Sequence, residues 1–209
     1  MRYLFPVLTL VAVLSAGSAV ATEEPSFSVR QTLGENIEVR TYAPLIVAET
    51  SVTEGRFKQA GNDGFRVLAD YIFGNNQGSR KIAMTAPVEQ RSSSKTEIAM
   101  TAPVEQSARA DGGWVVSFTM PSEWTLATLP LPVDPRVSIR EVPARDVAVI
   151  RFSGTWSDKR FAEKNGELLA AVAAAKLETK GEPWNARYDP PWTPWFMRRN
   201  EILVEVASP

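Results

Sequence analysis

The 209-residue chain contains no cysteine and no histidine. Without cysteine it has no disulfide bond, no thiolate nucleophile and no cysteine-based zinc or iron–sulfur centre. Without histidine it has no Ser-His-Asp triad, no imidazole general base and no imidazole ligand for a metal. The composition therefore excludes many common catalytic and metal-binding sites, and any ligation of a metal must come from other side chains.

The chain also lacks a strong excess of charge of either sign. It carries 23 basic and 24 acidic residues, which gives a formal net charge of −1. Nucleic acids and anionic membranes attract proteins with clustered positive charge. The charge balance therefore predicts no nucleic-acid partner and no electrostatic attachment to a membrane.

Long apolar runs are missing, except for one at the N-terminus. An apolar run over 4–14 and an A-x-A pattern at 19–21 are typical of a secretory signal peptide cut after Ala21. The run is short for a membrane-spanning helix, which needs about 20 residues, although an uncleaved anchor is the alternative. Cleavage removes Arg2 and leaves 188 residues with a net charge of −2. We expect an exported protein of the bacterial periplasm, with one domain over 22–209 and no stable membrane insertion.

Hydrophobic periodicity predicts an α+β chain with two amphipathic helices. The expected strands are 26–33, 36–52, 114–120, 137–154 and 200–206, the expected helices are about 55–73 and 157–177, and 181–199 is expected to form an aromatic-rich loop broken by prolines. The second half can be laid over the first, with Arg140 on Arg40 and Phe161 near Phe57. This plan predicts two halves that share one sheet or barrel, with both helices packed outside it.

One decapeptide occurs twice, as KIAMTAPVEQ over 81–90 and as EIAMTAPVEQ over 97–106. The polar link between the copies favours a hairpin whose two strands present the same side chains. In each strand Met84 or Met100 would alternate with residues on the opposite face, and the proline requires a bulge, a bend or an edge position. Flexible, polarisable methionines suit the rim of an apolar pocket, and ordinary core packing is the alternative.

Two longer motifs accompany the twin decapeptides. The stretch 114–154 begins WVVSFTMPSEWTLATLPLPVDP, and 186–202 is ARYDPPWTPWFMRRNEI. Together these motifs resemble the SOUL haem-binding protein family over about 27–206. The resemblance implies two pseudo-repeated halves, about 27–121 and 135–206, that form a distorted antiparallel β-barrel flanked by two helices, similar to GyrI-type domains. It also implies non-catalytic binding or carriage of haem or another tetrapyrrole in an apolar groove.

The resemblance further implies a haem surface along the first long helix and the MTxPV strand. In this chain the methionine of that motif is Met84, and Met100 belongs to its second copy. Arg80 and Lys81 are the basic candidates for the haem propionates, because a carboxylate accepts charge-assisted hydrogen bonds from such side chains. A solvated turn is the alternative for this basic pair. The candidates on the helix are Phe65, Leu68, Tyr71 and Ile72.

This chain departs from the family at the axial position of the haem iron. Some members are proposed to use a histidine there, and this sequence has none. Axial ligation would need a methionine, a tyrosine or a lysine, or the iron would have no protein ligand. The candidates are Met84, Met100, Tyr71 and Tyr42, and the sequence does not choose among them.

Two other functions remain open from the sequence. An enzyme on the same scaffold would rely on the duplicated carboxylates Glu89 and Glu105 as an acid–base pair. An interaction module would dock a partner through the aromatic loop 184–196, whose rings are equally suited to covering the core or lining a pocket. In the same region we expect Arg198 or Arg199 to bind a carboxylate and hold the two halves together.

We predict that export removes the first 21 residues, because the cleavage pattern ends at Ala21. Intact-mass measurement of the protein recovered from the periplasm of an expressing bacterium should find a chain that starts at Thr22. A chain that keeps Met1 and stays in the membrane fraction would show an uncleaved anchor instead.

Overall fold

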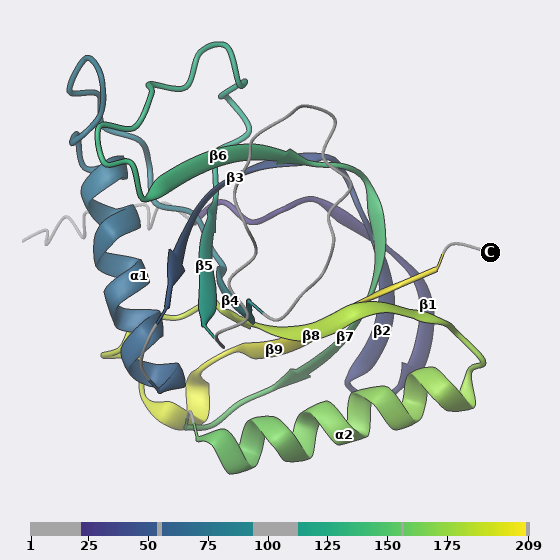
Figure 1. The fold of residues 1–209 in the computed structure, drawn as a ribbon. Coiled ribbons are helices and arrows are strands. Elements are labelled where there is room, and N and C mark those ends of the chain that lie inside the picture. The colour runs from purple at the N-terminus through teal and green to yellow at the C-terminus, as the bar shows by residue number, and fades with distance from the viewer. Residues whose placement is uncertain (1–21, 54–55, 94–112, 156, 208–209) are drawn as a thin grey trace, which may run out of the picture.

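The computed structural model describes residues 22–53, 56–93, 113–155 and 157–207. They form one nine-stranded sheet with two long helices on its outer side (Figure 1). The predicted α+β class is therefore confirmed. The elements are β1 (Phe27–Gly34), β2 (Ile37–Tyr42), β3 (Leu45–Val52), α1 (Phe57–Ile72), β4 (Val88–Ser92), β5 (Trp114–Thr119), β6 (Val137–Val142), β7 (Arg145–Phe152), α2 (Asp158–Ala174), β8 (Thr179–Arg187), η1 (Trp195–Met197) and β9 (Asn200–Val206).

The sheet has an open strand order with two ends. Its strands follow one another as β1-β2-β7-β9-β8-β4-β5-β3-β6, and all neighbours are antiparallel. Among the described residues no pairing joins β1 to β6, so the predicted barrel is not confirmed. The sheet nevertheless bends strongly, and both helices lie on its convex side (Figure 1).

Strands from the two halves of the chain pair with each other. β3 pairs with β5 of its own half and with β6 of the other half. In the same way, β7 pairs with β9 of its own half and with β2 of the other. This pairing joins both halves into one sheet. The internal repeat itself stays a prediction.

Prolines divide the stretches that the periodicity marks as long strands. The expected strand 36–52 breaks at Ala43-Pro44 into β2 and β3, and β6 is separated from β7 at Pro143-Ala144. Proline has no N–H to donate to a strand ladder. The chain changes partners at each break, since β2 pairs with β7 whereas β3 pairs with β5 and β6.

Strand β8 lies where the sequence predicted part of a proline-broken loop. Its pairing with β9 is irregular between Lys180 and Trp184, the interval that contains Pro183. A bulge of this kind accommodates a proline within a strand. The prediction was wrong because it treated Pro183 as the end of regular structure, and the loop begins only after Arg187.

Each helix covers its own apolar cluster on the outer face of the sheet. Leu68 anchors α1 and Leu168 anchors α2, and neither side chain is exposed to solvent. The clusters meet where the two helices begin, because the rings of Phe57 and Phe161 lie edge to face with centroids 5.1 Å apart. A third buried cluster covers the opposite face of the sheet and contains Tyr42, Val147, Val149, Trp184, Ala186 and Leu203.

Packing of α1 on β5 requires a glycine at position 64. A Cβ atom there would lie 2.5 Å from Cγ2 and 2.7 Å from Cβ of Val116. We predict that Gly64→Ala lowers the free energy of unfolding by about 1–3 kcal/mol, because the helix must move away from the strand. The matched control is Gly166→Ala in α2, where nothing lies within 4 Å of the new Cβ.

Gly166→Ala should leave stability unchanged or raise it by up to about 1 kcal/mol through the better helix propensity of alanine. Urea denaturation of the two variants measures both effects. Equal effects at Gly64 and Gly166 would contradict the close approach of α1 to β5.

Candidate functional site

A buried asparagine fixes the segment that follows α1. Asn76 donates from Nδ2 to the carbonyl oxygens of Tyr71 at 2.8 Å and Arg80 at 2.7 Å, and its Oδ1 accepts from the Arg80 amide at 2.9 Å. The amide of Ile82 then donates to the carbonyl of Ile72 at 2.8 Å. The start of the first decapeptide is therefore held against the C-terminal end of α1.

Three of the four helix candidates are core residues. Leu68 is 0% exposed, and Tyr71 and Ile72 are each 1% exposed. The hydroxyl of Tyr71 donates to the carbonyl of Pro130 at 2.9 Å, and burial raises the pKa of this phenol to about 12. These side chains support the surface above them and offer a ligand almost no surface of their own.

Phe65 is the helix candidate that reaches the surface. It is 40% exposed, although its ring also packs on that of Phe118, with centroids 5.3 Å apart. Phe73, directly after α1, is 63% exposed and was missed by the sequence analysis. The signal for it was its spacing, because Phe65, Ala69 and Phe73 follow one another at four-residue intervals along one helix face.

Residues 82–87 do not form the strand that was predicted for them. The hydroxyl of Thr85 donates to the carbonyl of Thr119, and the amide of Ala86 donates to the carbonyl of Glu23 at 2.9 Å. These contacts replace a regular ladder. Thr85 is buried as a result.

The predicted pairing of the twin decapeptides is wrong for the end of the first copy. Strand β4 is paired on both sides, with β5 over Val88–Ser92 and with β8 over Val88–Gln90. The second copy, with Met100 and Glu105, lies outside the described residues. The proposed roles of these two residues stay predictions, and so does the carboxylate pair that would include Glu89.

The remaining candidates lie near the C-terminal half of α1. Met84 is half-buried and packs against the apolar cluster under that helix. The guanidinium of Arg80 lies over the ring of Trp124, 4.4 Å from its centroid, and Lys81 is exposed. The structure thus places two cations and one methionine on the segment that follows the exposed rings of Phe65 and Phe73.

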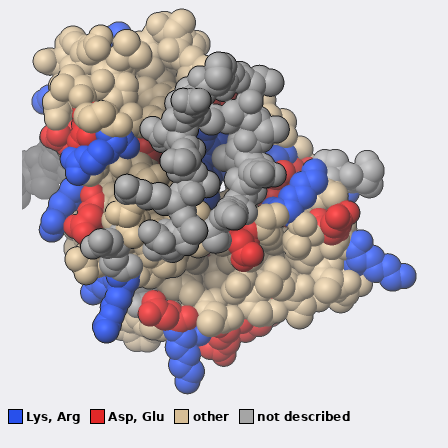
Figure 2. Space-filling view, viewed as in Figure 1, with Lys and Arg blue, Asp and Glu red and all other residues tan. Residues whose placement is uncertain are grey.

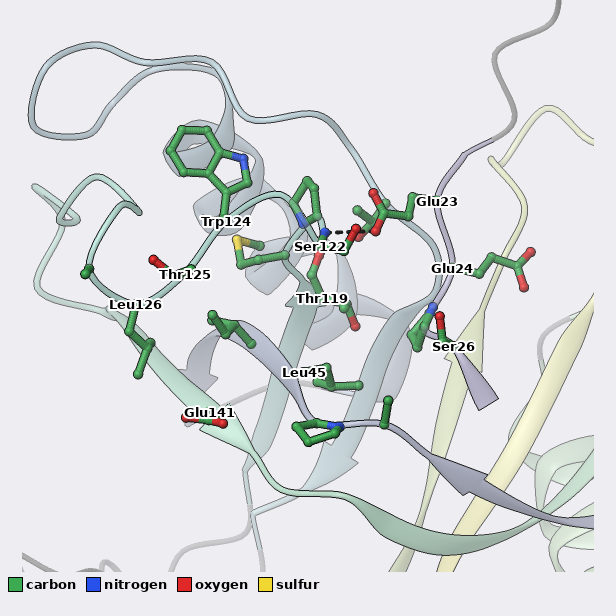
Figure 3. Close-up of a pocket in the computed structure, with 18 residues that line it drawn as sticks. Glu23, Glu24, Ser26, Leu45, Thr119, Ser122, Trp124, Thr125, Leu126 and Glu141 are labelled. Atoms are coloured by element: carbon green, nitrogen blue, oxygen red, sulfur yellow. Dashed lines mark hydrogen bonds between the residues drawn. The ribbon is translucent and has the colours of Figure 1, made fainter. Parts of the chain in front are cut away.

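A cavity of about 590 Å³ touches the same segment through Thr85 (Figure 3). It lies between the leader residues 23–26, the start of β3, the ends of β5 and β6 and the turn 121–127. Arg80, Lys81 and Met84 do not line it. Nothing in the sequence pointed to this cavity, because its lining comes from segments that are far apart along the chain.

A buried carboxylate lies on the face of the sheet opposite the helices. Glu201 is 0% exposed, and both of its oxygens accept hydrogen bonds from Arg40, at 2.8 Å and 3.1 Å. Arg199 donates from Nε at 3.0 Å and the Tyr188 hydroxyl donates at 2.7 Å. Arg199 also forms an ion pair with Glu24 of the leader at 2.8 Å. The expectation that one arginine of this motif binds a carboxylate is therefore confirmed for Arg199.

The network sets the protonation of its members. Burial alone would raise the pKa of the Glu201 carboxyl, but the hydrogen bonds and charges of Arg40 and Arg199 outweigh it, and the pKa is lowered. Burial raises the pKa of Tyr42 to about 12 despite the opposing effect of Arg40. Burial, together with the charge of Glu201, also raises the pKa of Tyr188.

The loop between β8 and β9 presents aromatic side chains to solvent. Trp192, Trp195 and Phe196 are exposed, so they do not cover the core. Arg198 holds the loop from within, because its guanidinium donates to the carbonyls of Thr193 at 2.7 Å and Pro191 at 2.6 Å. Figure 2 shows charged side chains of both signs spread over one face of the molecule, without one dominant patch.

Residues 22–205 match the family described as SOUL heme-binding protein. Heme-binding protein 2 from Homo sapiens is 31% identical to this chain, and the match covers 92% of this chain and 90% of the human protein. This chain therefore belongs to the SOUL heme-binding protein family. No helix among the described residues is long and apolar enough to cross a membrane.

Several solved structures share the fold at low sequence identity. The C-terminal domain of EcmrR is 12% identical with a TM-score of 0.58, over 83% of this chain and 98% of that domain. An uncharacterized conserved protein from Listeria innocua is 10% identical with a TM-score of 0.54, over 85% and 94% of the two chains. A hydrolase from Listeria innocua is also 10% identical, with a TM-score of 0.51, over 82% and 92%. At such identities the likeness shows the fold alone.

The Glu201 network yields a stability prediction. Glu201→Gln leaves Arg40 and Arg199 buried beside an uncharged amide, so the free energy of unfolding should fall by about 3–5 kcal/mol. The control is Glu167→Gln, which breaks a more exposed ion pair with Lys164 and should cost about 0–1 kcal/mol. Equal losses in urea denaturation of the two variants would contradict the account of the buried network.

The stability that Glu201 contributes should depend on pH, because its pKa is lowered in the folded protein. The stabilisation is fully present above the unfolded-state pKa, near the usual value of 4.5, and it is lost as the pH falls through the lower folded-state pKa. The stability difference between the wild type and Glu201→Gln should therefore shrink below about pH 4.5. A constant difference down to acid unfolding would contradict this.

Proposed function

We propose that this protein binds haem or another tetrapyrrole non-covalently and carries it without catalysing a reaction. Membership of the SOUL heme-binding protein family over residues 22–205 is the observation that carries the proposal. The human relative, heme-binding protein 2, supports it, because that protein is named for binding this group.

The end of α1 has the chemistry that a flat ligand with two carboxylates requires. Phe65 and Phe73 offer exposed rings for contact with the porphyrin, and Met84 is half-buried close behind them in the chain. Arg80 and Lys81 would bind the propionates through charge-assisted hydrogen bonds. The cavity of about 590 Å³ suits the same ligand less well, because three carboxylates line it and would repel the propionates.

The described residues narrow the choice of an axial ligand. A tyrosine binds iron as its phenolate, and the pKa values of Tyr42, Tyr71 and Tyr188 are all raised. Each of these hydroxyl groups also makes a hydrogen bond within the protein. We therefore propose Met84 as the axial ligand, with Met100 of the second decapeptide as the other candidate.

The proposal also includes the location and the architecture of the protein. Export to the bacterial periplasm rests on the apolar run and the cleavage pattern before Thr22. A pseudo-repeat of two halves is supported by the reciprocal pairing of β3 with β6 and of β7 with β2. A carrier needs no catalytic group, and the proposal assigns a catalytic role to no residue of the protein.

Haem titration of the purified protein, followed by Soret absorbance, tests the proposal. We predict a saturable, shifted Soret band. Met84→Leu should change the position of the band with little loss of stability, because leucine is close to methionine in volume. Met197→Leu is the matched control, since Met197 is exposed in the loop between β8 and β9.

Substitution of the basic pair tests how the propionates bind. Arg80→Gln and Lys81→Gln should each weaken haem binding by about three- to tenfold, the effect of losing one charge-assisted hydrogen bond near the surface. Arg66→Gln, on the exposed face of α1, is the control and should leave binding unchanged. An unshifted band that never saturates in the wild type would refute haem binding, and unchanged affinity in both basic variants would refute this placement.

A further inference from the structure

The cavity beside the leader differs in charge from the proposed haem surface. Its volume of about 590 Å³ falls within the range of small-molecule pockets, roughly 300–1,000 Å³. Leu45, Met120, Trp124 and Leu126 give it apolar walls. Its lining contains three glutamates and neither lysine nor arginine. Apolar walls with acidic groups at the edge favour a ligand that is hydrophobic and positively charged.

Two of the glutamates belong to the leader and differ in how their charge is balanced. Glu24 is paired with Arg199 at 2.8 Å, which offsets its charge. Glu23 accepts a hydrogen bond from the amide of Ser122 at 2.8 Å. That amide is a neutral donor, and no lysine or arginine among the described residues forms an ion pair with Glu23.

The third glutamate comes from another part of the fold. Glu141 lies on the edge strand β6, is exposed, and forms no ion pair with the described residues. Figure 3 shows Glu23 and Glu141 on opposite sides of the cavity, with Leu45 between them. Arg80 lies outside the lining, on the ring of Trp124. Glu23 and Glu141 therefore supply negative charge to the cavity, which favours a cationic ligand.

Residues 23–26, the leader, form one wall of the cavity. Contacts of Glu23, Glu24 and Ser26 with the rest of the fold hold this wall in place. The Glu23 carbonyl accepts from the amide of Ala86 at 2.9 Å, and the Ser26 carbonyl accepts from the amide of Ala43 at 3.1 Å. Together with the ion pair of Glu24, these contacts fix residues 23–26 to three separate segments. A wall that is ordered before binding reduces the entropy lost when a ligand binds.

We propose that this cavity binds a small organic monocation with an apolar group, such as a quaternary ammonium compound. The apolar group contacts Leu45, Met120 and Leu126, and the positive charge lies between the carboxylates of Glu23 and Glu141. A ligand with two carboxylates meets like charges at the same place. The cavity is therefore a second site, separate from the proposed haem surface at the end of α1.

Two amphiphiles with the same tail isolate the effect of charge. Octyltrimethylammonium and octanesulfonate are titrated into the purified protein by calorimetry, at concentrations below those at which either compound forms micelles. The cation should bind saturably, and the sulfonate at least about tenfold more weakly. Equal affinities, preference for the sulfonate, or no saturable binding of the cation would each overturn the proposal.

Substitutions then place the cation within the cavity. Glu141→Gln should weaken its binding by about three- to tenfold without changing the denaturation midpoint, because this side chain is exposed. Glu178→Gln, at an exposed glutamate outside the lining, is the matched control and should have no effect. Unchanged binding in Glu141→Gln would overturn the assigned position of the charge.

Competition separates this proposal from the proposed haem function. Saturation with haem should not displace octyltrimethylammonium, because the two ligands occupy different sites. If each molecule of haem displaced one molecule of octyltrimethylammonium, the two ligands would share a site, and this would overturn the proposal of a second site. A failed haem titration leaves the result with the cation unaffected, so the two proposals fail independently.

Discussion

A single buried carboxylate connects parts of the chain that are far apart in sequence. Glu201 of β9 is bound by Arg40 of β2 and by Tyr188 and Arg199 from the two ends of the loop between β8 and β9, and Arg199 reaches on to Glu24 of the leader. A buried charge is tolerated when its partners and hydrogen bonds are complete. The network therefore fixes β2 relative to β9 across the intervening strand β7, and it fixes the path of the chain before β1.

The position of the leader links this network to both proposed ligand sites. Glu23, next to the ion-paired Glu24, accepts from the amide of Ala86 in the first decapeptide and from the amide of Ser122 beside the cavity. One short segment thus contacts the first decapeptide and also lines the cavity, whose walls are apolar and whose charged lining residues are glutamates. The two proposed sites differ in the sign of their charged residues, so each would favour ligands of opposite charge to its own.

Periodicity was sufficient to predict the class of the fold and both long helices, because each helix buries one regular apolar face. It missed β8, since Pro183 hides a strand that continues through a bulge, and it gave no strand order, because partners distant in sequence leave no local pattern. The resemblance to the family at the MTxPV motif supplied Arg80, Lys81 and Met84 as candidate binding residues. The cavity and the burial of Glu201 could not be predicted, because each depends on several segments that only the folded chain brings together.

A haem site at the end of α1 can be tested by nuclear magnetic resonance, by comparing the protein bound to ferric haem with the protein bound to diamagnetic zinc protoporphyrin. Unpaired electrons on the ferric iron broaden the signals of amides close to it, whereas the zinc compound does not. If haem binds there, the amide signals of Phe65, Phe73 and residues 80–84 should be lost selectively, and those of residues 122–127 should be retained. Broadening centred on 122–127 instead, or no selective broadening, would contradict a haem site at the end of α1.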